Sequence, residues 1–139
     1  MFKDNETKLR NLFSPCQKPE DIYEKLLLLG KEQQLLPSSF KTQDHLVKGC
    51  QSKLYLHTVY KEGLFYFETE SDALISSGLA QTLVLLYNGL EGKDILTHKP
   101  SILEELGIIR HLSPGRSNGL AALDLKMRQE VLQIMVKTS

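Results

Sequence analysis

The chain has 139 residues, and its 17 Lys and Arg residues balance 17 Asp and Glu residues. With 41% hydrophobic residues it can bury a core of ordinary size. A formal net charge of zero gives no electrostatic reason to expect a nucleic-acid partner, because phosphates attract a basic surface. No apolar run approaches the roughly 18 residues typical of a membrane-spanning helix, and residues 1–6 lack the apolar region of a secretory signal. We therefore expect a cytoplasmic protein without nucleic-acid or membrane partners.

The first part of the chain is predicted to be mostly helical. After a short amphipathic segment, apolar residues spaced by three and four predict a helix from about Pro19 to about Gln34, and acids in its first turn favour that start. The residues that follow, 35–44, lose this period and include Pro37, which interrupts regular structure. They are therefore predicted to form a loop.

The middle of the chain is predicted to form a β-hairpin. Residues Lys53–Tyr60 alternate between two faces, and residues Leu64–Thr69 are rich in aromatic side chains. Between them, Lys61-Glu62-Gly63 is a short connection with a glycine, which favours antiparallel pairing of the two strands. Residues His45–Gly49 are a candidate for a third, short strand.

The second half of the chain is predicted to be helical again. The helical period returns after Ser71, which is a suitable N-cap residue. Residues Gly89-Leu90-Glu91-Gly92-Lys93 are interpreted as the end of this long helix and not as a phosphate loop, because they lack the Walker spacing. A capping box that begins at Ser101 and a glycine stop at Gly107 predict a further helix of one or two turns.

The last helix is predicted to begin near Asn118 or Gly119 and to run toward Val136. Its N-cap is either Ser117 or Asn118. The chain contains no internal repeat and no low-complexity tract. The order of helices, strands and helices predicts a single α+β domain over residues 1–139, in which a small antiparallel sheet packs against helices.

Cys50 is the first candidate for a reactive side chain. It lies in Lys48-Gly49-Cys50-Gln51-Ser52-Lys53, a loop directly before the alternating strand. A sulfur nucleophile must be a thiolate, and an ordinary cysteine is only about 3% ionised at neutral pH. The neighbouring Lys48 and Lys53 are candidates to favour the thiolate. The alternative is that Cys50 is a small buried apolar residue, as cysteines commonly are, and the local residues leave both roles open.

Other groups that could act with Cys50 carry weaker signals. Cys16 has no glycine or paired bases around it and is interpreted as structural; a resolving-thiol role would require its Cα atom within about 7 Å of that of Cys50. In a reducing compartment both cysteines are expected to be free thiols. His45 is a candidate general base or metal ligand. The four histidines show no metal-ligand spacing, so we expect no metal site.

Asp72 and Arg116 are two charged residues near helix starts. The helix dipole favours an acid at the position of Asp72 without any further role. Residues Leu112–Gly119 form a segment rich in helix breakers, and capping explains part of it but not its arginine. Arg116 either forms an ion pair with Asp72 or faces a carboxylate of a partner, and the sequence leaves both open.

Three motifs together resemble one family. They are Gly49-Cys50-Gln51-Ser52, then Ser71-Asp72-Ala73 with Gly78-Leu79, then Leu112-Ser113-Pro114 with Arg116-Ser117 and Gly119-Leu120. In this order and at these intervals they resemble the SufE family of sulfur acceptors, over nearly the whole chain. Proteins of that family are α+β domains, similar in fold to iron–sulfur scaffold proteins. They take persulfide sulfur from a cysteine desulfurase that depends on pyridoxal phosphate (PLP), for iron–sulfur cluster assembly.

The resemblance implies that Cys50 is the sulfur acceptor and that Gly49, Gln51 and Ser52 shape its loop. It also implies that Asp72 and Arg116 lie near the site or the partner surface. The expected partners are a SufS-like desulfurase, which the protein stimulates, and a downstream iron–sulfur scaffold; a homodimer is a further possibility. The chain itself is expected to need no cofactor, because PLP belongs to the desulfurase. It would be a covalent carrier and not an independent enzyme.

Two departures from the family pattern and two other functions complete the prediction. The family commonly has Val-Trp after its cysteine motif, where this chain has Leu54-Tyr55, and Gly115 predicts a looser loop before the arginine. One other function is a cysteine-dependent hydrolase that uses Cys50 and His45. Another is a non-catalytic interaction module with an inert cysteine. An iron–sulfur scaffold is disfavoured, because two cysteines are too few to ligate a cluster.

Overall fold

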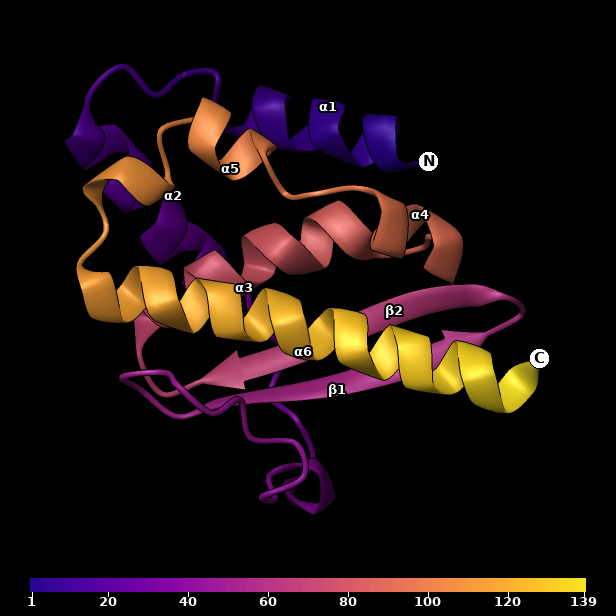
Figure 1. Ribbon diagram of the computed structural model, residues 1–139. Helices are drawn as coiled ribbons and strands as arrows, with labels where there is room; N and C mark the ends of the chain where they lie inside the picture. The colour runs from indigo at the N-terminus through magenta and orange to yellow at the C-terminus, as the bar shows by residue number, and fades with distance from the viewer.

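The computed structural model describes residues 1–139 and contains six α-helices and one two-stranded sheet (Figure 1). The helices are α1 (Phe2–Phe13), α2 (Pro19–Lys31), α3 (Leu74–Tyr87), α4 (Gly92–Thr97), α5 (Ile102–Glu105) and α6 (Pro114–Thr138). The strands are β1 (Leu54–Lys61) and β2 (Leu64–Ser71), and 3₁₀ turns lie at Ser38–Phe40 and Ile109–His111. Two helices, a hairpin and four further helices confirm the predicted α+β fold class. None of the helices is both long and apolar enough to cross a membrane.

The sheet is the predicted antiparallel hairpin. Strands β1 and β2 pair from Lys61 opposite Leu64 down to Leu54 opposite Ser71. Glu62 and Gly63 form the two-residue turn, and both have a positive φ, of 53° and 82°, as the twist of a tight hairpin favours. Because side chains alternate along a strand, one face of the hairpin is buried against the helices, and the other faces outward.

The predicted third strand is wrong. Leu46 forms only a single bridge with Tyr55, supported by hydrogen bonds from the Val47 amide to the Leu54 carbonyl and from the Leu56 amide to the His45 carbonyl, each of 2.8 Å. The chain then turns away from the sheet before a second bridge can form. A single bridge anchors this segment beside β1 without making it a strand.

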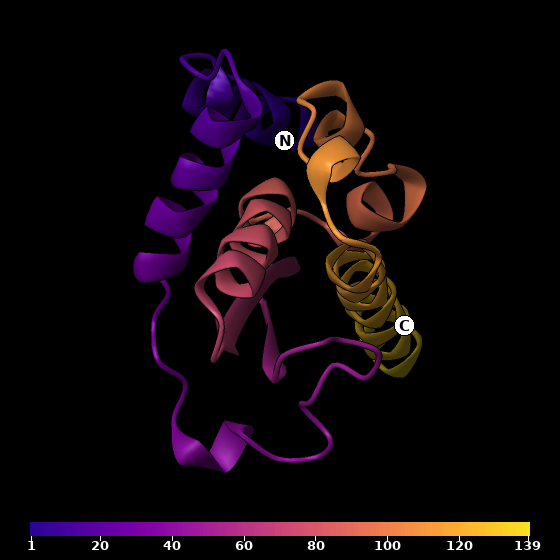
Figure 2. The same ribbon diagram turned by 90° about the vertical axis from the view of Figure 1, so that its left-hand side faces the viewer.

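Helix α3 lies at the centre of the fold. It packs on β2, and Figure 2 shows it between α2 on one side and α6 on the other. Helices α2 and α3 approach closely at Gly30 and Gly78, where an added Cβ atom would overlap the main-chain carbonyls of Leu74 and Leu26 respectively. The buried apolar residues of the helices and of the inner sheet face form one core. The walls around α3 are therefore close-packed, as folded interiors are.

A polar cluster attaches α6 to its neighbours. The Arg128 guanidinium bonds to the Asp124 carboxylate, the Tyr87 hydroxyl and the main-chain carbonyls of Ile95 and His98. The Tyr87 hydroxyl in turn donates to Asp124. Burial, with the nearby Asp124 charge, raises the pKa of Tyr87, so its hydroxyl stays protonated as a donor. This cluster fixes α6 against α3 and α4.

The predicted helix boundaries need three corrections. Helix α6 begins at Pro114, not near Asn118, because a proline suits the first helical position and the Ser113 hydroxyl accepts a 3.3 Å bond from the Arg116 amide. Its N-cap is therefore Ser113. The N-cap of α3 is Ala73, since Ser71 is still part of β2. Helix α2 ends three residues early, at Lys31.

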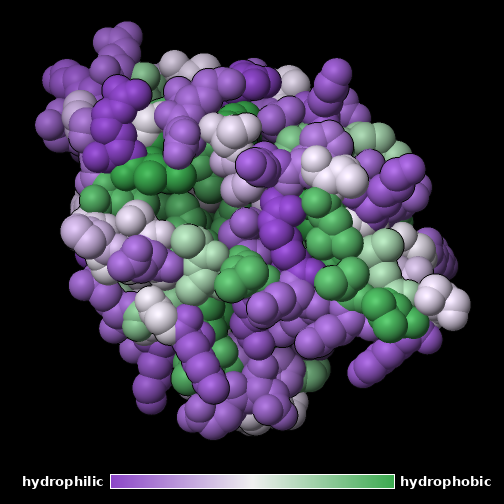
Figure 3. Space-filling view, in the orientation of Figure 1, coloured by the Kyte–Doolittle hydropathy of each residue, from purple (hydrophilic) through white to green (hydrophobic).

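Helix α4 was not predicted. Gly89 has a φ of 76° and turns the chain away from α3, as expected, but a separate helix of six residues starts at Gly92. An added Cβ atom at Gly92 would meet the Met135 side chain of α6, which would have to move to make room for it. Figure 3 shows apolar side chains that interrupt the hydrophilic surface on the face carrying α6. The exposed apolar residues of α6 are Leu125, Leu132 and Val136.

Candidate cysteine site

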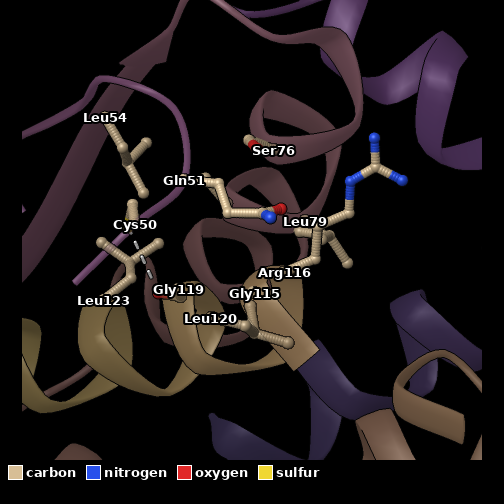
Figure 4. Close-up of a pocket in the computed structure, with 11 residues that line it drawn as sticks. Cys50, Gln51, Leu54, Ser76, Leu79, Gly115, Arg116, Gly119, Leu120 and Leu123 are labelled. Atoms are coloured by element: carbon tan, nitrogen blue, oxygen red, sulfur yellow. Dashed lines mark hydrogen bonds between the residues drawn. The ribbon is translucent and has the colours of Figure 1, made fainter. Parts of the chain in front are cut away.

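Cys50 lies on the loop that connects the Leu46 bridge to β1. Gly49 directly before it has a φ of 94°, a conformation that side chains with a Cβ atom rarely adopt. The nearest atom to a Cβ built there is the Ala122 Cβ atom at 3.6 Å, so the backbone angle and not crowding requires the glycine. This turn directs the Cys50 side chain toward α6 (Figure 4). Gly49 therefore allows the tight turn of the chain directly before Cys50.

A small cavity lies beside the Cys50 thiol. Its volume is about 20 Å³, and its walls come from the loop, the first residue of β1, α3 and α6. Most of the side chains that form these walls are apolar: Leu54, Leu79, Ala80, Leu120 and Leu123. A water molecule needs about 10–15 Å³ by this measure. The cavity therefore has room for one further group of about that size next to the sulfur.

Gly119 of α6 makes the space for the sulfur itself. The Cys50 thiol points to the Gly119 carbonyl, with the Sγ atom 3.7 Å from the oxygen. A Cβ atom built at Gly119 would lie 3.2 Å from Sγ, which is closer than an ordinary contact. An alanine at this position would require the Cys50 sulfur to move by a few tenths of an ångström.

Burial controls the charge state of this thiol. Cys50 is half-buried, and burial raises the pKa of its thiol. The expectation that Lys48 and Lys53 favour the thiolate is wrong for this conformation, because both side chains are exposed and burial alone sets the direction of the pKa shift. In this conformation the thiol is protonated at neutral pH and is a poor nucleophile.

Ser52 and Asp72 attach the loop to the start of α3. The Ser52 hydroxyl lies 2.8 Å from the Ser76 hydroxyl and 3.3 Å from the Ser71 hydroxyl. The Asp72 carboxylate accepts a 3.1 Å hydrogen bond from the Lys53 amide, and the Asp72 amide donates back to the Lys53 carbonyl at 3.3 Å. Both residues therefore lie near the site and fix the C-terminal end of the cysteine loop. Ser76 was not singled out in the sequence, because nothing local marks a helix serine that bonds to a distant loop.

Arg116 does not form the ion pair with Asp72 that was one of its two expected roles. The Asp72 carboxylate bonds to the Lys53 amide instead, and Arg116 takes part in no ion pair of this chain. Arg116 borders the cavity, but its guanidinium points away from Cys50 (Figure 4). The expected looser loop at Gly115 is also wrong, because Gly115 lies in the first turn of α6.

His45 and Cys16 lie away from the cavity. His45 Nδ1 is 3.0 Å from the Thr42 hydroxyl, and its ring packs on Phe40 at 5.3 Å between centroids. Cys16 follows α1, where burial, and then the Asp21 charge, raise the pKa of its thiol. Neither side chain lines the Cys50 cavity, so the site holds a single thiol. No group of three or more His, Cys, Asp or Glu side chains is close enough together to hold a metal ion.

This geometry is that of a small α+β protein with a single loop thiol as its candidate reactive group. A small α+β fold holds one thiol on a loop, beside a cavity that has room for one more group. As a thiolate, such a group can attack the outer sulfur of a persulfide, with the other thiolate as the leaving group.

The chain belongs to the SufE family, described as the Fe-S metabolism associated domain, whose profile matches residues 7–131. It is 35% identical over 127 residues to SufE-like protein 1, chloroplastic/mitochondrial, of Arabidopsis thaliana, covering 91% of this chain and 34% of that protein. It is also 35% identical over 117 residues to the sulfur acceptor protein CsdE of Escherichia coli, covering 83% and 80% of the two chains. The chain thus spans about a third of the plant relative and most of the bacterial one.

A solved structure shows the same fold. The solution structure of a hypothetical protein from Thermus thermophilus superposes with a TM-score of 0.77, over 95% of this chain and 96% of the other. The sequence identity is 19%, so this similarity concerns the fold alone.

Proposed function

We propose that the protein is a sulfur acceptor, which takes persulfide sulfur from a PLP-dependent cysteine desulfurase onto Cys50 and passes it on for iron–sulfur cluster assembly. Membership of the SufE family supports this role, as does the similarity to a bacterial protein named a sulfur acceptor. The observation that carries the assignment to Cys50 is its cavity, which has room for one further group beside Sγ. A transferred sulfur atom is a group of that size.

The transfer is a thiol exchange. The Cys50 thiolate attacks the outer sulfur of the desulfurase persulfide, a new S–S bond forms on Cys50, and the S–S bond of the desulfurase breaks. The desulfurase cysteine leaves as a thiolate and takes up the proton that Cys50 gave up. No electrons are gained or lost overall, so the step needs no further oxidant or reductant.

The loop must change position for this step. The cavity half-buries Cys50, and this burial raises the pKa of the thiol, which opposes attack on a partner. Outward rotation of residues 49–51 would restore an ordinary thiol pKa and bring Sγ to the partner surface. Gly49 permits such rotation, and Ser52 and Asp72 determine where it stops. Arg116, which has no carboxylate partner within the chain, would face one on the desulfurase.

The protein in this proposal is a carrier and activator and has no independent catalytic activity. PLP stays with the desulfurase, which we expect to be SufS-like, and an iron–sulfur scaffold in the cytoplasm receives the sulfur. The residues that line the Cys50 cavity come from separate parts of one chain. The hydrolase alternative loses support, because the proposed base, His45, bonds to Thr42 and lies outside the cavity.

The test is the intact mass of the protein after reaction with a SufS-like desulfurase, PLP and L-cysteine, followed by desalting without reductant. One transferred sulfur adds about 32 Da, and dithiothreitol should remove it by exchange. Cys50→Ser should show no added mass, whereas the matched control Cys16→Ser should load like the unmodified chain. An unchanged mass with desulfurases that load another acceptor would contradict the proposal and favour the interaction module.

A further inference from the structure

Gln51 lies between the Cys50 cavity and the solvent. It follows the cysteine directly and lines the same cavity, yet its side chain is exposed. Figure 4 shows this side chain extending from the loop across the space between α3 and α6, toward Gly115. The polar amide therefore occupies the solvent side of a cavity whose other walls are mostly apolar.

Gly115 provides the place where the Gln51 side chain rests. A Cβ atom built at Gly115 would overlap the Cγ, Cδ and Nε2 atoms of Gln51. Gly115 has no left-handed backbone angle, so the side chain that a larger residue in this first turn of α6 would meet is that of Gln51. Any other residue at position 115 would displace the Gln51 side chain.

Two glycines one helical turn apart thus receive two successive loop residues. Gly119 accommodates the sulfur of Cys50, and Gly115, four residues earlier and on the same face of α6, accommodates Gln51. The loop closes as a unit against this face.

We propose that Gln51 is a positioning residue that closes the Cys50 cavity when its side chain packs against Gly115. In this position it limits the access of small thiols and electrophiles to the sulfur on Cys50. The role that we give to this closure rests on the proposed sulfur-acceptor function. An external thiolate that attacks the outer sulfur of a Cys50 persulfide removes that sulfur and leaves the Cys50 thiolate. A closed Gln51 slows this loss until the desulfurase or the downstream acceptor opens the loop.

The closure can be tested on the free thiol, without any partner. In a Cys16→Ser background, the rate of alkylation of Cys50 by iodoacetamide is measured by intact mass. Gln51→Ala should increase this rate on the order of fivefold, because reaction follows the population of the open state. Gly115→Ala should give a similar increase although it does not change residue 51, because the new methyl group occupies the space where the Gln51 side chain packs.

The two substitutions should not add. Since both act through one contact, the double variant should react no faster than the faster single variant. The direction of the change in alkylation rate in Gly115→Ala is also informative. Alanine favours a helix, so an effect on helix stability alone would stiffen α6 and slow the alkylation of Cys50. Asn118→Ala, an exposed position in the same part of α6 that does not line the cavity, is the matched control and should react at the unmodified rate.

Three results would overturn the inference: unmodified rates in both single variants, slower alkylation of Gly115→Ala, or fully additive increases. Thermal unfolding of each variant checks that the fold persists. The readout is independent of sulfur transfer, so a chain that accepts no sulfur but shows this pattern would contradict the proposed function and leave the closure intact. If sulfur loads normally, the same two variants should also lose it faster to dithiothreitol.

Discussion

Helix α6 meets the rest of the protein in two regions that are built differently. In its middle, Arg128 and Asp124 bond to each other and to groups of α3 and α4, and each hydrogen bond of this cluster involves a charged or buried partner. At its N-terminal end, α6 offers glycines to the cysteine loop, whose closest polar contact there is a 3.7 Å approach of Sγ to a carbonyl.

The middle of α6, held by the Arg128–Asp124 cluster, is thus fixed more firmly than the cysteine loop at its N-terminal end. Charged hydrogen bonds are strong and directional, so they hold the helix in one position. Contacts of a thiol and an amide with glycine are weak, so the loop can leave its place without disturbing the helix. Under the proposed function, the site would both cover a sulfur atom and present it, and this combination suits that role. Three measurements test the contrast between the two regions.

The largest expected loss of stability is at the Arg128–Asp124 cluster in the middle of α6. Arg128→Ala leaves the Asp124 carboxylate without its cation and two main-chain carbonyls without their donor, and should lower the free energy of unfolding by about 3 kcal/mol. Urea unfolding measures the change. Arg10→Ala is the matched control, because its pair with Glu105 is exposed to solvent and should matter little. Equal, small losses in both variants would show that the cluster does not fix α6.

The next effect is at the attachment of the loop. Ser52→Ala removes the contacts with the Ser76 and Ser71 hydroxyls and should lower the free energy of unfolding by about 1 kcal/mol. It should also speed the alkylation of Cys50, because the loop is then held by fewer bonds. Ser117→Ala is the control, since that hydroxyl bonds only to the Pro114 carbonyl of its own helix turn. Slower unfolding or an unchanged alkylation rate in Ser52→Ala would argue against this role.

The smallest effect is a pH dependence. Burial raises the pKa of the Cys50 thiol in the folded state, so the folded chain keeps its proton where the unfolded chain loses it. The resulting stabilisation is fully present below the ordinary thiol pKa of about 8.5 and is lost as the pH rises through the higher folded value. In a Cys16→Ser background, urea unfolding at several alkaline pH values should show this decline. Cys50→Ser should show a smaller decline, and equal slopes would refute the burial effect.

The parts of the fold that follow from local patterns could be predicted from the sequence. The alternation in Lys53–Tyr60 and the spacing of apolar residues after Ser71 predicted the hairpin and α3, because each pattern reflects one buried face. The start of α6 could not be predicted so well. Pro114 and Gly115 are helix breakers in most positions, and only the cap by Ser113 and the contact with the loop explain them here.

Only part of the candidate site could be predicted from the sequence, for the same reason. Cys50 and its loop are visible in the sequence, because the glycine before the cysteine and the strand after it are local signals. The cavity, the bonds of Ser52 to Ser76 and the contact of Gln51 with Gly115 join residues far apart in the chain. The same holds for Asp72, whose bond to the Lys53 amide replaces the ion pair that its charge suggested.

The size of the cavity has a consequence for stoichiometry. At about 20 Å³ it has space for about one further group beside Sγ. Under the proposed function, that space matches a load of one sulfur atom per chain. A longer polysulfide on Cys50 would have to extend past Gln51 toward the solvent side of the cavity, where thiols in solution would reach its outer sulfur first.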